Sequence, residues 1–286
     1  MVNPILMNPQ NMNQLLSDKE LLPDLEKDGY TVIDFLDKGE IQTLIDLYNL
    51  LPHRLGGGFI PSIMSRDINY RQLINREIKQ LLAEKTASLF KLYRLCFWSF
   101  VVKQASRADS EVQMHQDWSF VDETKFNSLG IWCPLVDVSP FNGCIHLVKG
   151  SHRLNSKHRG LFNDFPYENL LPLIRQKYLT ALPMQAGQAL VYDTRIFHCS
   201  PPNQTASERV VLAGLMIPED SILRYYHCDF QNCPSKLEIF EVDDEFYTRV
   251  ILGVKPEGLT SLGFIDREFE LLSPENLASQ LNNEVI

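Results

Sequence analysis

The chain has 286 residues, enough for one large domain or two small ones. Hydrophobic residues make up 44% of it, which is ordinary for a globular chain that buries a sizeable core. The net charge of −9 argues against a protein that binds nucleic-acid backbones, because such binding needs a basic face.

The N-terminal part, about residues 1–95, is predicted to be mainly helical. Residues 30–35 first predict a short strand after a turn at Gly29. In residues 40–51 and 70–93, apolar side chains recur at helical spacing, which predicts two helices.

The next part, about residues 96–220, is predicted to form a β-rich core. Its apolar segments are short, rich in β-branched and aromatic residues, and separated by Pro and Gly: residues 97–103, 129–138, 144–148, 189–193 and 210–217. Many short strands with turns between them predict a sandwich or a jelly roll. The tail, residues 221–286, is predicted to mix loops with short helices such as 274–281. We expect a single domain over residues 1–286, mainly β, with helices flanking the core.

The cysteines predict no disulfide framework, so we expect reduced and mostly packed thiols at Cys96, Cys133, Cys144, Cys199, Cys228 and Cys233. A zinc site at His227, Cys228 and Cys233 is disfavoured because the spacing is loose and a second Cys pair is missing. The N-terminal residues lack the pattern of a signal peptide, and no segment approaches the ~20 apolar residues of a bilayer span. We therefore expect a soluble, cytoplasmic protein.

Two histidines and one carboxylate form the candidate metal site. His115 and Asp117 are two residues apart, so in an extended segment both side chains point to the same side. His198 follows a later apolar strand and can supply a third ligand. Two imidazoles and one carboxylate on one face leave three coordination positions open, as in the facial triad of non-haem Fe(II) oxygenases.

Taken alone, this motif is weak, because His-x-Asp occurs often by chance and usually makes an ordinary hydrogen bond. The context strengthens it. Arg209 lies eleven residues after His198, where a guanidinium on a neighbouring strand can bind a carboxylate with two hydrogen bonds. Ser200 can donate its hydroxyl to the same carboxylate. Arg209 alone would more often be a solvated surface residue.

These residues, with three further segments, resemble the phytanoyl-CoA dioxygenase-like (PhyH) family of Fe(II)/2-oxoglutarate oxygenases. The resemblance runs from about Asp28 to Pro218. It includes residues 28–35 as an opening strand, the His-Gln-Asp motif at 115–117, the Asn-Gly to Gly-Ser-His segment within 141–152, and residues 186–193 before His198. Trp132 fits a family position that lines the 2-oxoglutarate site, although a core aromatic is an equally good interpretation.

The resemblance implies a fold, a chemistry and a set of roles. The fold would be a double-stranded β-helix, a cupin-like jelly roll. His115, Asp117 and His198 would hold Fe(II), and Arg209, Ser200 and Trp132 would bind the cosubstrate 2-oxoglutarate. With O₂, the enzyme would oxidise a small molecule and release succinate and CO₂. No residue outside the metal centre is expected to be catalytic, and no nucleic-acid partner is expected.

Asp117 also bears on the type of reaction. Related halogenases carry a small residue at this position to make room for chloride, so the resemblance implies hydroxylation here and not halogenation. Desaturation, epoxidation and cyclisation stay open as alternatives within the same class. Outside it, the alternatives are a non-catalytic cupin-like metal-binding module and a zinc hydrolase with the same three ligands.

Other residues have two interpretations or a structural one. Lys103 either lines the pocket, as this region does in relatives, or is a solvated lysine at a strand end, which we favour slightly. The loop around residues 56–58, three consecutive glycines, is either a mobile lid or a flexible connection. The remaining histidines are expected to be surface or structural residues: His53, His146, His152, His158 and His227.

Overall fold

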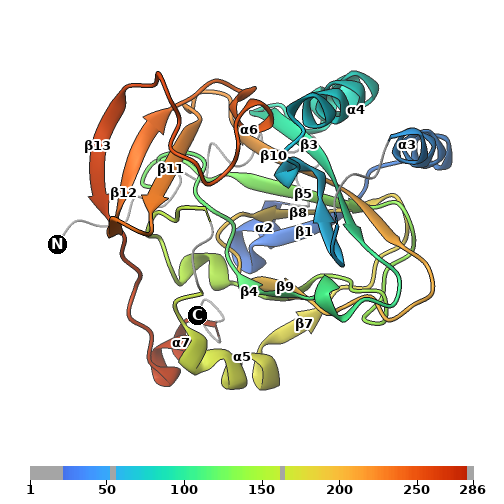
Figure 1. Ribbon diagram of the computed structural model, residues 1–286. Coiled ribbons are helices and arrows are strands. Elements are labelled where there is room, and N and C mark those ends of the chain that lie inside the picture. The colour runs from blue at the N-terminus through green and yellow to red at the C-terminus, as the bar shows by residue number, and fades with distance from the viewer. Residues whose placement is uncertain (1–21, 52–55, 162–164, 282–286) are drawn as a thin grey trace.

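Two antiparallel β-sheets face one another in the computed structural model, which describes residues 22–51, 56–161 and 165–281 (Figure 1). The larger sheet has six strands in the order β1-β8-β5-β10-β3-β2. Their bounds are β1 (Tyr30–Asp34), β8 (Gln188–Asp193), β5 (Leu129–Pro134), β10 (Arg209–Pro218), β3 (Tyr93–Lys103) and β2 (Phe59–Pro61). All the pairings in this sheet are antiparallel.

The smaller sheet has four strands in the order β4-β9-β6-β7. Their bounds are β4 (Val112–His115), β9 (His198–Ser200), β6 (His146–Val148) and β7 (Leu179–Ala181). Trp132 and Val211 of the larger sheet pack with Leu147 of the smaller one, so the two inner faces share one apolar cluster. This arrangement confirms the expected mainly β, jelly-roll core.

Alternation of side chains along the strands separates the inner face of each sheet from its outer face. In β5, Trp132 points inward, whereas Ile131 and Cys133 belong to a second cluster on the outer face. Helices α3 (Lys38–Leu50) and α4 (Ile68–Leu89) cover that outer face. The two helices were predicted at residues 40–51 and 70–93. The second ends earlier than predicted because Tyr93 already begins β3.

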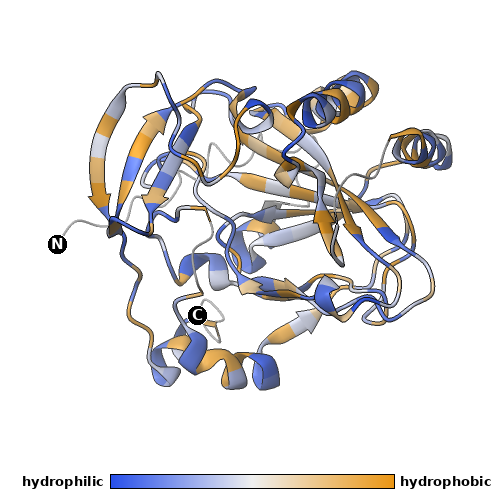
Figure 2. Ribbon diagram, viewed as in Figure 1, coloured by the Kyte–Doolittle hydropathy of each residue, from blue (hydrophilic) through white to orange (hydrophobic). Residues whose placement is uncertain are grey.

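The outer face of the smaller sheet is covered by α5 (Leu171–Lys177) and α7 (Pro274–Leu281), which lie beside it in Figure 1. Met114 and Phe197 point into this outer layer, so their neighbours His115 and His198 point the other way, into the space between the sheets. Figure 2 shows apolar residues along the strands of both sheets and polar residues on the exposed sides of the helices.

The tail differs from the prediction of loops and short helices. It forms a third antiparallel sheet of three strands, β11 (Arg224–Asp229), β12 (Cys233–Glu241) and β13 (Ser261–Asp266). Within residues 221–281, the described part of the tail, α6 (Phe246–Arg249) and α7 are the only helices. The alternation in these strands is broken by register shifts in both pairings, which hides their period from the sequence.

The remaining elements are short. They are helix α2 (Leu22–Asp28) and the 3₁₀ turns η1 (Ser62–Met64), η2 (Ala108–Ser110), η3 (Ser151–Arg153) and η4 (Glu168–Leu170). Four of the six cysteines are buried, and all six are free thiols. Among the described residues, no helix has the length and apolar character needed to cross a bilayer.

A buried ion pair fixes the loop that follows β4. The guanidinium of Arg159 donates to both carboxylate oxygens of Glu123, at 2.8 and 2.9 Å, and both side chains are almost fully buried. The same guanidinium donates through Nε to the backbone oxygen of Asp117 at 2.7 Å. Arg159 and Ser119 are also joined by two hydrogen bonds of 2.9 Å, which tie the two segments together.

Replacing Arg159 with Met is expected to cost about 3–5 kcal/mol of unfolding free energy, because the Glu123 carboxylate is then buried without its counter-charge. Urea denaturation measures this. The matched control is Arg76→Met, which breaks an exposed pair with Glu77 and should cost within about 1 kcal/mol. Equal losses in the two variants would contradict a structural role for the buried pair.

Candidate metal centre

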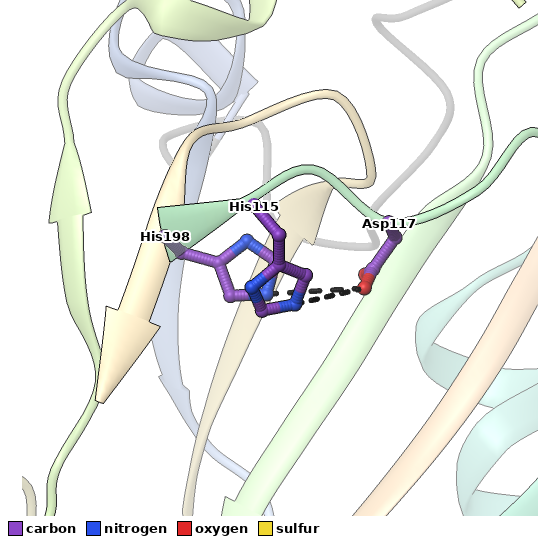
Figure 3. A group of neighbouring side chains, drawn as sticks. All are labelled: His115, Asp117 and His198. Atoms are coloured by element: carbon purple, nitrogen blue, oxygen red, sulfur yellow. Dashed lines mark ion pairs between the residues drawn. The ribbon is translucent and has the colours of Figure 1, made fainter. Parts of the chain in front are cut away.

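His115 of β4 and His198 of β9 lie directly opposite one another in the antiparallel ladder, with ring centroids 4.2 Å apart. Asp117 follows β4, and its Oδ1 is 3.8 Å from Nε2 of each histidine (Figure 3). One ligand atom from each residue lies within 4.8 Å of the others. The structure therefore brings together the three residues predicted from the sequence.

Hydrogen bonds from the ring nitrogens set the tautomer of both histidines. Nδ1 of His115 is 2.8 Å from the backbone oxygen of Gln113, and Nδ1 of His198 is 3.0 Å from that of Ile196. A carbonyl oxygen only accepts, so each Nδ1 carries a proton, and Nε2 is the ring nitrogen left to face a metal. Burial lowers the pKa of His115 to about 4, helped by the neighbouring His198, so this ring is neutral at physiological pH.

Asp117 is held by its backbone and by one carboxylate oxygen. Its N–H donates to the backbone oxygen of Thr194 at 3.0 Å, and its own backbone oxygen accepts from Arg159. The hydroxyl of Tyr192 donates to Oδ2 at 2.9 Å. Burial and the adjacent carboxylate raise the pKa of Tyr192 well above its usual value, so the phenol stays protonated. The sequence analysis missed Tyr192 and Arg159, because neither belongs to a recognisable ligand motif.

Arg209 begins β10, and its side chain is 1% exposed. One guanidinium nitrogen donates to the backbone oxygen of Gly143 at 2.6 Å, while Nε and the other terminal nitrogen are buried without a hydrogen-bond partner. The guanidinium carbon lies 5.4 Å from the ring centroid of Trp132, which is also buried. Burial lowers the pKa of Arg209 to about 9, so the group is still charged at neutral pH. Arg209 is thus an interior cation and not the solvated residue of the alternative interpretation.

Ser200 is also buried, on β9, two residues beyond His198. Lys103 lies opposite Arg209 in the β3–β10 ladder and is fully buried, so its interpretation as a solvated lysine was wrong. Its amine donates to the backbone oxygens of Ser200 and Pro201 at 3.0 and 2.5 Å. Burial, with a smaller effect from Arg209, lowers the pKa of Lys103 to about 7.

A cavity of about 250 Å³ adjoins the metal centre at His115. Besides that histidine, its lining comprises Gln116, Asn155, Arg159, Phe165, Pro166, Arg267, Glu268 and Phe269. The last three residues follow β13, so the tail forms part of the wall.

The other histidines that the structure describes lie outside this centre. Within the described part of the chain, His115, Asp117 and His198 are the only group of three or more His, Cys, Asp or Glu residues that can share a metal ion. His227 with Cys228 and Cys233 makes no such group. His53 lies outside the described residues.

A family model, curated relatives and solved structures match this chain. The family model for phytanoyl-CoA dioxygenase (PhyH) matches residues 58–211, more than half of the chain, and this range contains all six predicted site residues. The phytanoyl-CoA dioxygenase of Arabidopsis thaliana is 30% identical over 101 residues, which are 35% of this chain and 36% of that protein. Phytanoyl-CoA dioxygenase 1 of Oryza sativa subsp. japonica is 28% identical over 105 residues, 36% of this chain and 37% of that protein. The match thus spans little more than a third of each plant protein.

Solved structures share the fold at lower identity. The non-haem α-ketoglutarate-dependent epimerase SnoN of nogalamycin biosynthesis is 22% identical, with a TM-score of 0.53 over 76% of this chain and 86% of that one. The carbocyclase SnoK of the same biosynthesis is 19% identical, with a TM-score of 0.54 over 84% and 94%. HygX of Streptomyces hygroscopicus, with nickel, 2-oxoglutarate and hygromycin B bound, is 16% identical, with a TM-score of 0.53 over 71% and 88%. With the family model covering the core of both sheets and the metal centre, the chain belongs to the phytanoyl-CoA dioxygenase (PhyH) family.

Proposed function

We propose that this protein is a non-haem Fe(II) enzyme that uses 2-oxoglutarate and O₂ to oxidise a small molecule, with release of succinate and CO₂. One observation carries the proposal. A three-residue metal centre lies on the inner face of one sheet, and a buried guanidinium with two unpartnered nitrogens begins a strand of the facing sheet. A dianion such as 2-oxoglutarate can chelate a metal at one end and bind a cation through the carboxylate at its other end.

The donor set suits ferrous iron. Two imidazoles and one carboxylate leave the remaining positions for cosubstrate and O₂. When bound, the iron and 2-oxoglutarate supply the oxidising chemistry, and the protein supplies orientation and exclusion of water. His115, Asp117 and His198 are already aligned for this purpose, since both Nε2 atoms and Oδ1 face a common point.

The cosubstrate site is assigned to Arg209, Ser200 and Trp132. The free guanidinium edge of Arg209 can donate two charge-assisted hydrogen bonds to the distal carboxylate of 2-oxoglutarate. A buried cation without a counter-charge is costly, so an anion beside it is strongly favoured. Ser200 adds a hydroxyl, and the ring of Trp132 lies within cation–π distance of the guanidinium, 5.4 Å from its central carbon to the ring centroid.

The reaction assigned to the centre is hydroxylation and not halogenation, because the Asp117 carboxylate takes the position that a halide would need. The substrate is assigned to the cavity beside His115, where Phe165 and Phe269 provide apolar surface. Nucleic acid is not expected as a partner of this acidic chain.

The parent protein, reconstituted with Fe(II), should form succinate from 2-oxoglutarate in an O₂-dependent reaction. A screen of metabolites should identify a compound that accelerates this reaction. Asp117→Ala should bind Fe(II) poorly and lose this turnover.

Arg209→Met should keep Fe(II) affinity but bind 2-oxoglutarate about 10- to 100-fold more weakly, because it loses hydrogen bonds to a charged group. Calorimetry and succinate analysis measure these outcomes, with Arg76→Met as a surface control.

Undiminished succinate formation by Asp117→Ala would contradict its role as a ligand. If the parent binds the metal tightly but forms no succinate with any compound of the screen, the result would instead favour a non-catalytic metal-binding module.

The affinity for 2-oxoglutarate should fall as the pH rises above about 7. The dianion bound near Arg209 favours the charged form of Lys103, whose pKa is about 7 before binding. Above that pH, binding must take up a proton, which weakens it by up to about tenfold per pH unit. Calorimetry of the Ni(II)-loaded protein between about pH 6.5 and pH 9 measures this slope. Lys103→Met should flatten it, and identical slopes for parent and variant would contradict the assignment to Lys103.

A further inference from the structure

The carboxylate of Asp117 has one oxygen engaged by the protein and one turned to the metal centre. Oδ2 accepts from the Tyr192 hydroxyl at 2.9 Å, while Oδ1 lies 3.8 Å from Nε2 of both His115 and His198. The backbone N–H and backbone oxygen of Asp117 are also bonded, to Thr194 and Arg159. Among the hydrogen bonds of the described residues, Oδ1 is therefore the polar atom of Asp117 left for an external ligand.

We propose that Tyr192 is a positioning residue that makes Asp117 bind the metal through Oδ1 alone. This inference rests on the proposed function, since it concerns the same centre. A carboxylate with both oxygens free can bind an ion through two atoms and take an extra coordination position. Holding Oδ2 on a phenol prevents this and keeps three positions open for cosubstrate and O₂.

A glycine on the neighbouring strand leaves space for the ring of Tyr192. Tyr192 on β8 lies opposite Gly130 on β5, and a Cβ on Gly130 would lie 2.3 Å from the tyrosine ring. Only a glycine therefore lets the ring lie over its neighbouring strand. The ring also packs edge-on against His198, with centroids 5.4 Å apart, so Tyr192 contacts two of the three ligands.

The contact cannot be explained by core filling alone. A phenylalanine would fill the space of the ring as well, and it would leave no hydroxyl to satisfy. The hydroxyl is directed at the metal-binding carboxylate and donates to its far oxygen. Outer partners of metal ligands orient them in this way, and their loss commonly weakens metal binding 10- to 100-fold.

The test compares Tyr192→Phe with Tyr226→Phe, each of which removes one oxygen atom. Tyr226 is a matched control because it is buried and its hydroxyl donates to the backbone oxygen of Val121 at 2.9 Å. Its other hydrogen-bond partner is Arg224, which is not one of the three ligands. Titration calorimetry with Ni(II), without 2-oxoglutarate, should give a Kd about 10- to 100-fold weaker for Tyr192→Phe and an unchanged Kd for Tyr226→Phe. Thermal unfolding of the metal-free proteins should show a similar decrease in Tm for both variants.

A spectroscopic measurement reports on the coordination itself. In the Co(II)-loaded proteins, Tyr192→Phe should alter the visible absorption, which is sensitive to coordination number, while Tyr226→Phe should match the parent. The inference is overturned if Tyr192→Phe binds Ni(II) as tightly as the parent, or if both variants weaken binding equally. A parent that binds no Ni(II) or Fe(II) would overturn the proposed function as well, and the two failures are thereby distinguished.

Discussion

The antiparallel pairing of His115 with His198 is the constraint on which the centre depends. Opposed residues on neighbouring strands share a face, so pairing these two places both imidazoles in the space between the sheets. A shift of one residue in either strand would turn its histidine toward the outer layer, where Met114 and Phe197 now pack. The apolar outer layer thus fixes the register, and the register fixes the positions of the two imidazoles in the candidate metal centre.

The interior carries charge that the protein alone does not neutralise. Lys103 lies opposite Arg209 on the neighbouring strand, and repulsion from Arg209 adds to burial in disfavouring the charged form of Lys103. Their amine and guanidinium are partly bonded to backbone oxygens, and two nitrogens of Arg209 have no partner. Such a site lowers the stability of the free protein and raises its affinity for an anion, because ligand binding removes the electrostatic cost.

The sequence was informative where the chemistry needs particular residue types in short segments. His115 and Asp117 are two residues apart, and the segments around them and around His198 and Arg209 resemble known relatives. Short segments rich in β-branched and aromatic residues, separated by Pro and Gly, predicted the long strands of the larger sheet, and helical spacing predicted α3 and α4. Three-residue strands such as β9 are too short to show a period, so their pairing was not predictable.

Contacts between distant segments were also beyond sequence reasoning. The ion pair between Arg159 and Glu123 joins residues that look like ordinary surface charges in the sequence. Lys103 was misjudged for a related reason, since strand ends are usually exposed and only the facing sheet buries this one. The strands of the tail were not predicted because register shifts at their bulges interrupt the alternation of apolar residues that marks a strand in the sequence.

The wall of the cavity has a dual origin. His115 and Arg159 come from the part of the chain shared with the family, whereas Arg267, Glu268 and Phe269 come from a segment beyond residue 211, where the family match ends. The cavity wall therefore combines residues inside the family match with three residues beyond it. Changes in the segment after β13 can reshape one side of this cavity without altering His115, Asp117 or His198, because these three residues lie on other segments of the chain.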